Sequence, residues 1–380
     1  MISPTKFSLP TQLPRWPSHD PFLLLLTFIL PLGGVMLVAS ARIPSVLGGQ
    51  SLFERVTVLQ MGFAAAGVAL ALGISAIDYH KYRRWAPLSL VPIWLLLIAV
   101  LFVEDTTSEF GARRWFRVGD LTLQPSEFAK IFFIGAIAAL AHIYGAKIRS
   151  WRYSIARLGG IVGLVVIPII LEPDLGTALM TAFVGGVMIF AAGAHLKHLG
   201  IAIIALLPIG LASIYQHPYQ WTRLNTFLRG DPDLTKTGYQ AEQARIAMGW
   251  GGITGRGLGE GTQKFRLPVP DSDAIFAVLG EEFGLIGTSL VAVLFLALFV
   301  RGIQIAFASQ DIFGRLLAVG IVTQLCGQAF INMAVMTSLV PVTGIPLPFI
   351  SRGGSSLLAS LILLGILMNI ARNNALRQRM

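Results

Sequence analysis

Residues 20–41 read DPFLLLLTFILPLGGVMLVASA, and no charged side chain follows Asp20 within this stretch. About 20 apolar residues are enough for a helix to cross the hydrocarbon core of a bilayer. A polar tail precedes the run and no small-residue cleavage site is apparent, so we expect a retained span rather than a signal peptide. Similar runs recur along the chain and predict ten spans in all, at residues 21–41, 57–77, 86–103, 128–145, 155–171, 176–193, 198–216, 276–306, 314–336 and 353–371.

The composition also indicates a membrane protein. Of the 380 residues, 54% are hydrophobic and 13% are charged, about half the charged fraction of a soluble domain. We therefore predict an all-α polytopic membrane protein, with a single ten-helix membrane domain over residues 21–371 between an N-terminal tail (1–20) and a C-terminal tail (372–380). The net charge of +10 includes no Lys/Arg tract, which argues against nucleic acid as a partner and favours anionic lipid headgroups or a phosphorylated lipid. The single cysteine, Cys326, excludes an intrachain disulfide.

The distribution of lysine and arginine predicts the orientation in the membrane. Both tails and most of the even-numbered loops are basic, whereas the short odd-numbered loops carry only Arg42, Arg55 and Arg352. By the positive-inside rule, both termini lie in the cytoplasm. Two odd-numbered loops, residues 104–127 and the large loop 217–275 between the seventh and eighth helices, are basic although they face outside. Their charge therefore calls for a functional reason.

Polar motifs gather in the loops on that outer side. They are GARRWFRVGDLTLQPSEFAK (111–130), EPDLGTA (172–178), GYQAEQARIAMGWGGITGRGLGEGTQKFRLPVPDSD (238–273) and PVTGIPLPFISRGGSS (341–356), in the third, fifth, seventh and ninth loops. We expect them to form one extracytoplasmic site. Glycines in the seventh loop allow backbone N–H groups to approach an anion, although they equally suit flexible turns. A dinucleotide-binding fold is excluded because no strand precedes GRGLGEG.

Cationic side chains in these motifs suit a phosphorylated ligand. Arg113 and Arg114 present planar guanidinium groups that match phosphate oxygens, and lipid-headgroup anchoring is the alternative role. Lys130 lies about one turn into the fourth span, where an unpaired ammonium costs on the order of several kcal/mol. Glu127 stands three residues earlier on the same helical face, so a purely structural Glu127–Lys130 pair is the alternative to ligand binding.

Other polar residues of the motifs restrict the kinds of ligand and reaction that the site can support. The seventh loop holds seven basic residues, Arg245 and Lys264 among them, which favours an anionic ligand. Ser355 and Ser356 stand at the mouth of the tenth span and could cap that helix. Serine nucleophilic catalysis is disfavoured because no Gly-x-Ser-x-Gly elbow with a histidine partner is apparent. The six histidines form no metal-binding spacing, which disfavours a zinc enzyme.

Four acidic residues border the eighth span in LPVPDSDAIFAVLGEE (267–282). A loop carboxylate beside cations could deprotonate a sugar hydroxyl, and partial desolvation at the membrane edge would raise its pKa toward the working range. Asp271 and Asp273 could instead be solvated or cap the eighth helix. For Glu281 and Glu282, the electrostatics of a helix start is a sufficient explanation.

The four motifs resemble, in order and across almost the whole chain, those of the SEDS family (shape, elongation, division and sporulation), which includes the FtsW and RodA types. DPFLLLLTFILPLGGVMLVASA and GLGEGTQK are more similar to the FtsW type. The resemblance implies a peptidoglycan glycosyltransferase that polymerises lipid II on the outer face of the bacterial cytoplasmic membrane, releases undecaprenyl diphosphate, and serves cell division or elongation. Its implied partners are a class B penicillin-binding protein, a crosslinking transpeptidase, and other divisome or elongasome membrane proteins. A lipid II flippase and a non-catalytic scaffold are the alternatives.

The resemblance also implies where the catalytic acid lies. The family's essential acid belongs to a His-Thr-Asp triplet, which reads Asp271-Ser272-Asp273 here, so the general base is expected at Asp273. The chain departs from the family pattern at Asp271, which replaces the histidine, at Ala274, which replaces the usual phenylalanine, and at Arg352, where a tyrosine is common.

The implied reaction assigns roles to further residues. The base would deprotonate the acceptor hydroxyl for attack with inversion at the anomeric carbon, while Arg114 and Lys130 stabilise the departing diphosphate. A divalent cation, Mg²⁺ or Mn²⁺, is expected to assist, held by Asp271, Glu281 or Glu282. No organic cofactor is expected. The remaining residues expected to bind substrate are Arg113, Glu127, Arg245, Gln263, Lys264, Ser355 and Ser356.

Overall fold

The computed structural model describes residues 20–43, 55–103, 113–119, 121–216, 218–229 and 237–377. Nearly all of the expected N-terminal tail, and the last three residues of the expected C-terminal tail, lie outside the described residues. The helices are α1 (Pro21–Ala41), α3 (Arg55–Ala76), α4 (His80–Arg83), α5 (Leu90–Val100), α6 (Pro125–Tyr144), α7 (Gly160–Leu171), α8 (Leu175–Ala191), α9 (Leu196–Gln216), α10 (Pro218–Arg229), α11 (Thr237–Gly251), α12 (Ile275–Ala308), α13 (Ile312–Met336) and α14 (Gly354–Arg377), with the short helices η1 (Gly145–Arg149), η2 (Arg152–Gly159) and η3 (Gln263–Phe265).

Each of the ten expected spans coincides with an apolar helix of the described chain. Eight helices are long and apolar enough to cross a membrane, and α5 and α8 are shorter apolar helices. The prediction of a helical polytopic membrane protein is therefore confirmed. Two three-residue strands were not expected: β1 (Phe116–Val118) pairs antiparallel with β2 (Leu121–Leu123). This hairpin lies in the third loop, directly before α6.

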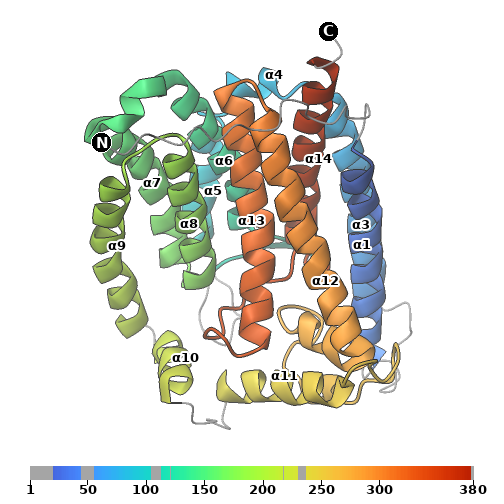
Figure 1. Cartoon of the computed structure of the whole chain (residues 1–380). Coiled ribbons are helices and arrows are strands. Elements are labelled where there is room, and N and C mark those ends of the chain that lie inside the picture. Colours follow the sequence, from blue (N-terminus) through green and yellow to red (C-terminus); the bar gives the residue numbers. More distant parts are fainter. Residues whose placement is uncertain are drawn as a thin grey trace, which may run out of the picture.

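The bundle is organised around α13 and α14, whose side chains are largely buried, while α9 lies at its edge (Figure 1). Helix α14 packs closely against α3 because glycines stand at their contact. A Cβ at Gly365 of α14 would lie 2.6 Å from the carbonyl oxygen of Ala71, and one at Gly67 of α3 would lie 2.5 Å from the side chain of Leu361. Small residues at such crossings let helix backbones approach each other within a membrane.

The helices of the large seventh loop lie at one end of the bundle, where α11 runs across it and α10 lies beside the end of α9 (Figure 1). Its glycine-rich segment after α11 is bound to α12 through the backbone: Leu285 donates its N–H to the Gly252 carbonyl at 2.9 Å. A Cβ at Gly251 would lie 1.9 Å from the carbonyl oxygen of Gly280, so only glycine allows this approach. Helix α12 bends at Gly284, which has non-helical dihedral angles (φ 63°, ψ −158°).

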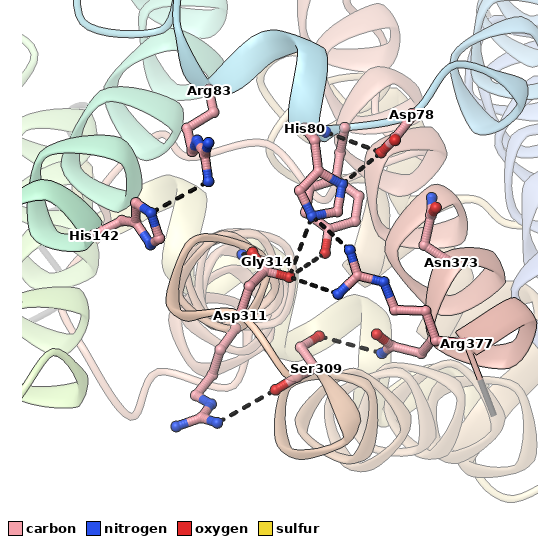
Figure 2. Close-up of polar contacts among 12 residues, drawn as sticks. Asp78, His80, Arg83, His142, Ser309, Asp311, Gly314, Asn373 and Arg377 are labelled. Atoms are coloured by element: carbon pink, nitrogen blue, oxygen red, sulfur yellow. Dashed lines mark hydrogen bonds and ion pairs between the residues drawn. The ribbon is translucent and has the colours of Figure 1, made fainter. Parts of the chain in front are cut away.

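A network of polar side chains lies at the opposite end of the bundle from the seventh loop, near α4 and the C-terminus (Figure 2). Asp311 caps the start of α13 by accepting the Gly314 N–H at 2.8 Å, and it also accepts the Tyr79 hydroxyl at 2.5 Å. His80 Nε2 lies 3.5 Å from the Asp311 carboxylate and 3.1 Å from the Arg377 guanidinium. This network fixes the ends of α3, α13 and α14 relative to one another.

Candidate functional site

Asp273 lies directly before α12, where four elements converge. Its Oδ2 accepts from Gln240 Nε2 of α11 at 3.0 Å, and its carbonyl accepts from Asn332 Nδ2 of α13 at 2.9 Å. Gly344, in the loop after α13, faces both Asp273 and Arg223 of α10: a Cβ there would lie 4.0 Å from Asp273 Oδ2 and 3.8 Å from the Arg223 guanidinium. Burial raises the pKa of Asp273, although the Gln240 hydrogen bond and the Arg223 charge act to lower it. A carboxylate with a raised pKa is a better general base near neutral pH.

The alternative that Asp273 caps the eighth helix is wrong. The residue at the N-cap of α12 is Ala274, whose side chain makes no capping hydrogen bond. The carboxylate of Asp273 is instead directed to Gln240 of another helix. A half-buried carboxylate that does not cap its own helix is available for another task.

Asp271 is buried between two guanidinium groups. Its Oδ2 accepts from Arg42 Nε at 2.6 Å and lies 3.3 Å from a terminal nitrogen of Arg352. The Arg352 N–H donates to the Asp271 carbonyl at 2.8 Å, and the Ser351 hydroxyl donates to the Ser272 carbonyl, also at 2.8 Å. The end of the seventh loop is therefore bound side by side with the end of the ninth.

Lys130 and Glu127 form the buried ion pair that their spacing suggested, with Nζ 2.7 Å from Oε1. Lys130 also lies 3.4 Å from the amide oxygen of Gln328, which donates its own N–H to the Pro346 carbonyl at 2.9 Å. One turn further along α13, Asn332 donates to the Ile345 carbonyl at 2.8 Å as well as to Asp273. Lys130 is thus linked through α13 and the ninth loop to the region of Asp273.

Sequence reasoning missed this polar row on α13. Gln324, Gln328 and Asn332 recur every four residues inside a span, and Gln324 donates to the Gln328 amide oxygen at 2.9 Å. The signal was present, because buried polar residues in a membrane helix are costly and are retained for a purpose. The spacing places all three on one face of α13.

Arg114 is anchored to the EPDLG segment. Its guanidinium donates to the carbonyl of Glu172 at 3.1 Å and to that of Pro173, and it lies 3.9 Å from Asp174. Asp174 in turn caps α8 by accepting the Thr177 N–H at 3.1 Å. About a third of the Arg114 side chain stays exposed. The third and fifth loops therefore meet, as the single-site hypothesis expected, and leave one cation accessible.

Glu172 is a second residue that the sequence reasoning did not single out. It is fully buried, and neither carboxylate oxygen has a hydrogen-bond partner within the described chain. Burial and the nearby charge of Asp174 raise the pKa of Glu172 to about 8, against the opposing effect of Arg114. This carboxyl is therefore largely protonated at neutral pH.

The two glutamates that end the 267–282 stretch have structural partners, so the helix-start explanation for them is wrong. Helix α12 begins at Ile275, well before either residue. Glu281 accepts the backbone N–H groups of Thr262 and Gln263 at 2.7 and 3.0 Å. Glu282 forms a pair with Lys264, with Nζ 2.9 Å from Oε1 and neither side chain exposed. Both carboxylates bind the seventh loop to the helix that follows it.

Several residues expected to bind substrate are engaged within the protein. Lys264 has no exposed side-chain surface, so the expectation that it contacts substrate does not fit this structure. Gln263 is also buried. Ser355 accepts the Gln124 N–H and donates to the Thr122 carbonyl, each at 3.1 Å, which binds the start of α14 to the β-hairpin and α6.

The remaining predicted substrate residues differ in exposure. Ser356 is buried. Arg245 is paired with Glu242 and is largely exposed on α11. Arg113 is exposed and donates to the Leu101 carbonyl at 2.8 Å. These last two cations lie where a ligand could reach them.

The residues proposed for a divalent cation do not fit that role. The Asp271 oxygen is paired with two guanidinium groups, and Glu281 is occupied by backbone N–H donors. Among the residues that the structure describes, no group of three or more His, Cys, Asp or Glu side chains could hold a metal ion. Two carboxylates that already have cationic or amide partners are poor ligands for Mg²⁺, which needs free oxygens.

These observations define the class: a polytopic membrane protein with a half-buried carboxylate among cations at one end of its helix bundle. The chain belongs to the family described as cell cycle protein, that of FtsW, RodA and SpoVE, which matches residues 20–376. The probable peptidoglycan glycosyltransferase FtsW of Trichlorobacter lovleyi is 40% identical over 367 residues, covering 94% of both chains. The stage V sporulation protein E of Bacillus subtilis is 38% identical over 363 residues, covering 93% of this chain and 97% of that protein.

Solved structures show the same fold. A chain from a peptidoglycan synthase complex, studied for the coordination of polymerization and crosslinking, superposes with a TM-score of 0.75 at 27% identity, covering 94% of this chain and 99% of that chain. The rod shape-determining protein RodA of Thermus thermophilus gives a TM-score of 0.67 at 25% identity, covering 95% and 99%. The chain is closer in sequence to the FtsW relatives than to RodA, as predicted.

Proposed function

We infer that this chain is a peptidoglycan glycosyltransferase that uses lipid II as its substrate. The observation that carries the proposal is Asp273: a half-buried carboxylate with a raised pKa, held by Gln240 and facing the loop that also borders Arg223. The relatives named as FtsW bear the same activity in their names. An enzyme needs such a positioned carboxylate, whereas a flippase or a scaffold does not.

In the proposed reaction Asp273 is the general base. Its carboxylate takes the proton of the acceptor sugar hydroxyl, and that oxygen attacks the anomeric carbon of the donor as the bond to the lipid diphosphate breaks. Attack from the face opposite the leaving group inverts the anomeric configuration. Because Asp273 Oδ2 is held by Gln240 and its backbone by Asn332, the base is oriented before substrate arrives, which reduces the entropic cost of reaching the transition state.

The leaving diphosphate needs cations. Arg114 keeps part of its guanidinium exposed beside the EPDLG segment, so we assign it to the diphosphate. Lys130 is neutralised by Glu127 and is almost fully buried. We therefore assign Lys130 and Glu127 to supporting the ninth loop through Gln328, a role that differs from the direct contact first expected.

The membrane placement and the partner follow from the same proposal. We place both termini in the cytoplasm and the Asp273 end of the bundle outside, because the short even-numbered loops are basic. We also propose that a class B penicillin-binding protein joins this chain, since a structural neighbour belongs to a complex that coordinates polymerization and crosslinking. In that arrangement the glycan strand emerges beside the crosslinking enzyme, and other divisome or elongasome proteins complete the assembly.

A polymerisation assay with purified lipid II in detergent tests the proposal. Flippase and scaffold activities make no glycan strands there, so strand synthesis by the purified chain, with its transpeptidase partner present, supports the enzyme. We expect Asp273→Asn to lower the rate by about 10²–10⁴-fold, the usual contribution of a positioned general base. Glu260→Gln is the matched control, because Glu260 is an exposed acid of the same loop. A D273N protein that polymerises at the normal rate would refute the assignment.

A further inference from the structure

We propose that Arg42, Asp271 and Arg352 form a charge clamp that positions the carboxylate of Asp273. The clamp joins three regions that are far apart in sequence: the end of α1, the end of the seventh loop, and the segment that leads into α14. This proposal rests on the proposed function, because it takes Asp273 as the base. It makes Asp271 a positioning residue, which neither contacts substrate nor binds metal.

The geometry of the clamp is that of a buried, shared carboxylate. Both guanidinium groups approach the same oxygen, Oδ2 of Asp271, at 2.6 Å from Arg42 and 3.3 Å from Arg352. The Asp271 side chain is 3% exposed, whereas those of Arg42 and Arg352 are 21% and 36% exposed. Removal of one partner from a buried pair leaves an uncompensated charge, which destabilises the local structure much more strongly than loss of a surface pair.

The clamp is coupled to Asp273 through a short stretch of backbone whose carbonyls are hydrogen-bonded. Asp271 is two residues away, and its carbonyl accepts the Arg352 N–H at 2.8 Å. The carbonyl of Ser272 accepts the Ser351 hydroxyl at 2.8 Å, and that of Asp273 accepts Asn332 at 2.9 Å. The backbone carbonyls of residues 271–273 are thus all hydrogen-bonded to the ninth loop or to α13. Of these three residues, Asp271 also forms ion pairs, with Arg42 and Arg352.

The clamp brings together two positions at which the chain departs from the family pattern. Asp271 and Arg352 are the positions where this chain carries an acid and a cation instead of the histidine and tyrosine of that pattern. In the structure these two residues contact each other.

Steady-state polymerisation kinetics with the full chain and its transpeptidase partner test the clamp. We expect D271N and R352Q each to lower kcat by about tenfold or more, because a displacement of about 1 Å at a catalytic group costs up to about 10²-fold. The KM for lipid II should change by less than about twofold, since no substrate contact is lost. The double variant D271N/R352Q should lose less activity than the product of the two single losses, because the two residues share one interaction.

R301Q is the matched control. Arg301 forms an ion pair with Asp20 at 2.7 Å, and the two side chains are 23% and 1% exposed, nearly the same geometry and burial as Arg42 and Asp271. Asp20 precedes the start of α1, and Arg42 follows its end, so the control pair lies at the opposite end of that helix from the clamp. R301Q should leave kcat unchanged. Melting temperatures of all variants establish that each is folded before rates are compared.

The outcomes are distinct. If D273N is inactive but D271N and R352Q keep normal kcat, the clamp is overturned while the proposed function stands. If D273N is active, the base assignment and the clamp fall together. If R352Q is normal and D271N only raises the Mg²⁺ concentration needed for activity, Asp271 is a metal ligand and the clamp is overturned. If R352Q raises KM with kcat unchanged, Arg352 binds substrate directly, which also overturns it.

Discussion

Replacement of Lys264 by methionine should destabilise the protein strongly and leave substrate affinity unaffected. Its ammonium donates to Glu282 at 2.9 Å, to the Gly259 carbonyl at 2.7 Å and to the Ser40 hydroxyl at 3.2 Å, and neither Lys264 nor Glu282 has exposed side-chain surface. K264M leaves the Glu282 carboxylate buried without a counter-charge. Breaking a buried pair in this way costs about 3–5 kcal/mol of folding free energy.

The double variant K264M/E282Q tests whether the uncompensated Glu282 charge causes the loss of stability. With both charges gone, no uncompensated ion remains in the interior, so we expect most of the lost stability to return, to within about 1–2 kcal/mol of the wild type. Arg245→Gln is the control: Arg245 pairs with Glu242 but is largely exposed, and loss of such a pair costs about 0–1 kcal/mol.

Thermal unfolding in detergent, followed together with lipid II kinetics, gives the measurement. K264M should lower the melting temperature by several degrees, R245Q should lower it little, and the double variant should lie close to the wild type. An unchanged melting temperature for K264M combined with a raised KM would refute the buried-pair argument. It would also restore the original expectation that Lys264 binds substrate.

Two further predictions concern the glycine-rich segment and the buried glutamate. G251A should abolish folding or activity, because its Cβ would lie 1.9 Å from the Gly280 carbonyl oxygen, whereas G249A should be tolerated because nothing lies within 4 Å of a Cβ there; expression and melting temperature report both. Glu172 has a folded pKa of about 8 against an ordinary value of 4.5. Between those values the folded state holds a proton that the unfolded chain releases, so stability falls as pH rises. E172Q should flatten this decline between pH 6 and 8, and an unchanged slope in melting temperature would contradict it.

The contacts of the candidate site can be predicted from the sequence where both residues lie within a few positions of each other. The Glu127–Lys130 pair was proposed from its three-residue spacing and is present, because two side chains on one helical face meet whatever surrounds them. The polar row of Gln324, Gln328 and Asn332 on α13 can likewise be identified from its four-residue spacing. The partners of Asp271 were not readable, because Arg42 and Arg352 stand 229 and 81 residues away in the chain.

The sequence by itself determined the class of protein and the position of each apolar helix, because the cost of placing polar groups in hydrocarbon is counted residue by residue along the chain. It also predicted which motifs form the candidate site. Only the tertiary structure decided which partners each acid of the 267–282 stretch has. Asp273, Asp271 and Glu282 are the same kind of carboxylate within one short stretch. Packing from distant elements gives Asp271 two arginines and Glu282 a buried lysine, and it leaves Asp273 with the amide of Gln240 and a raised pKa.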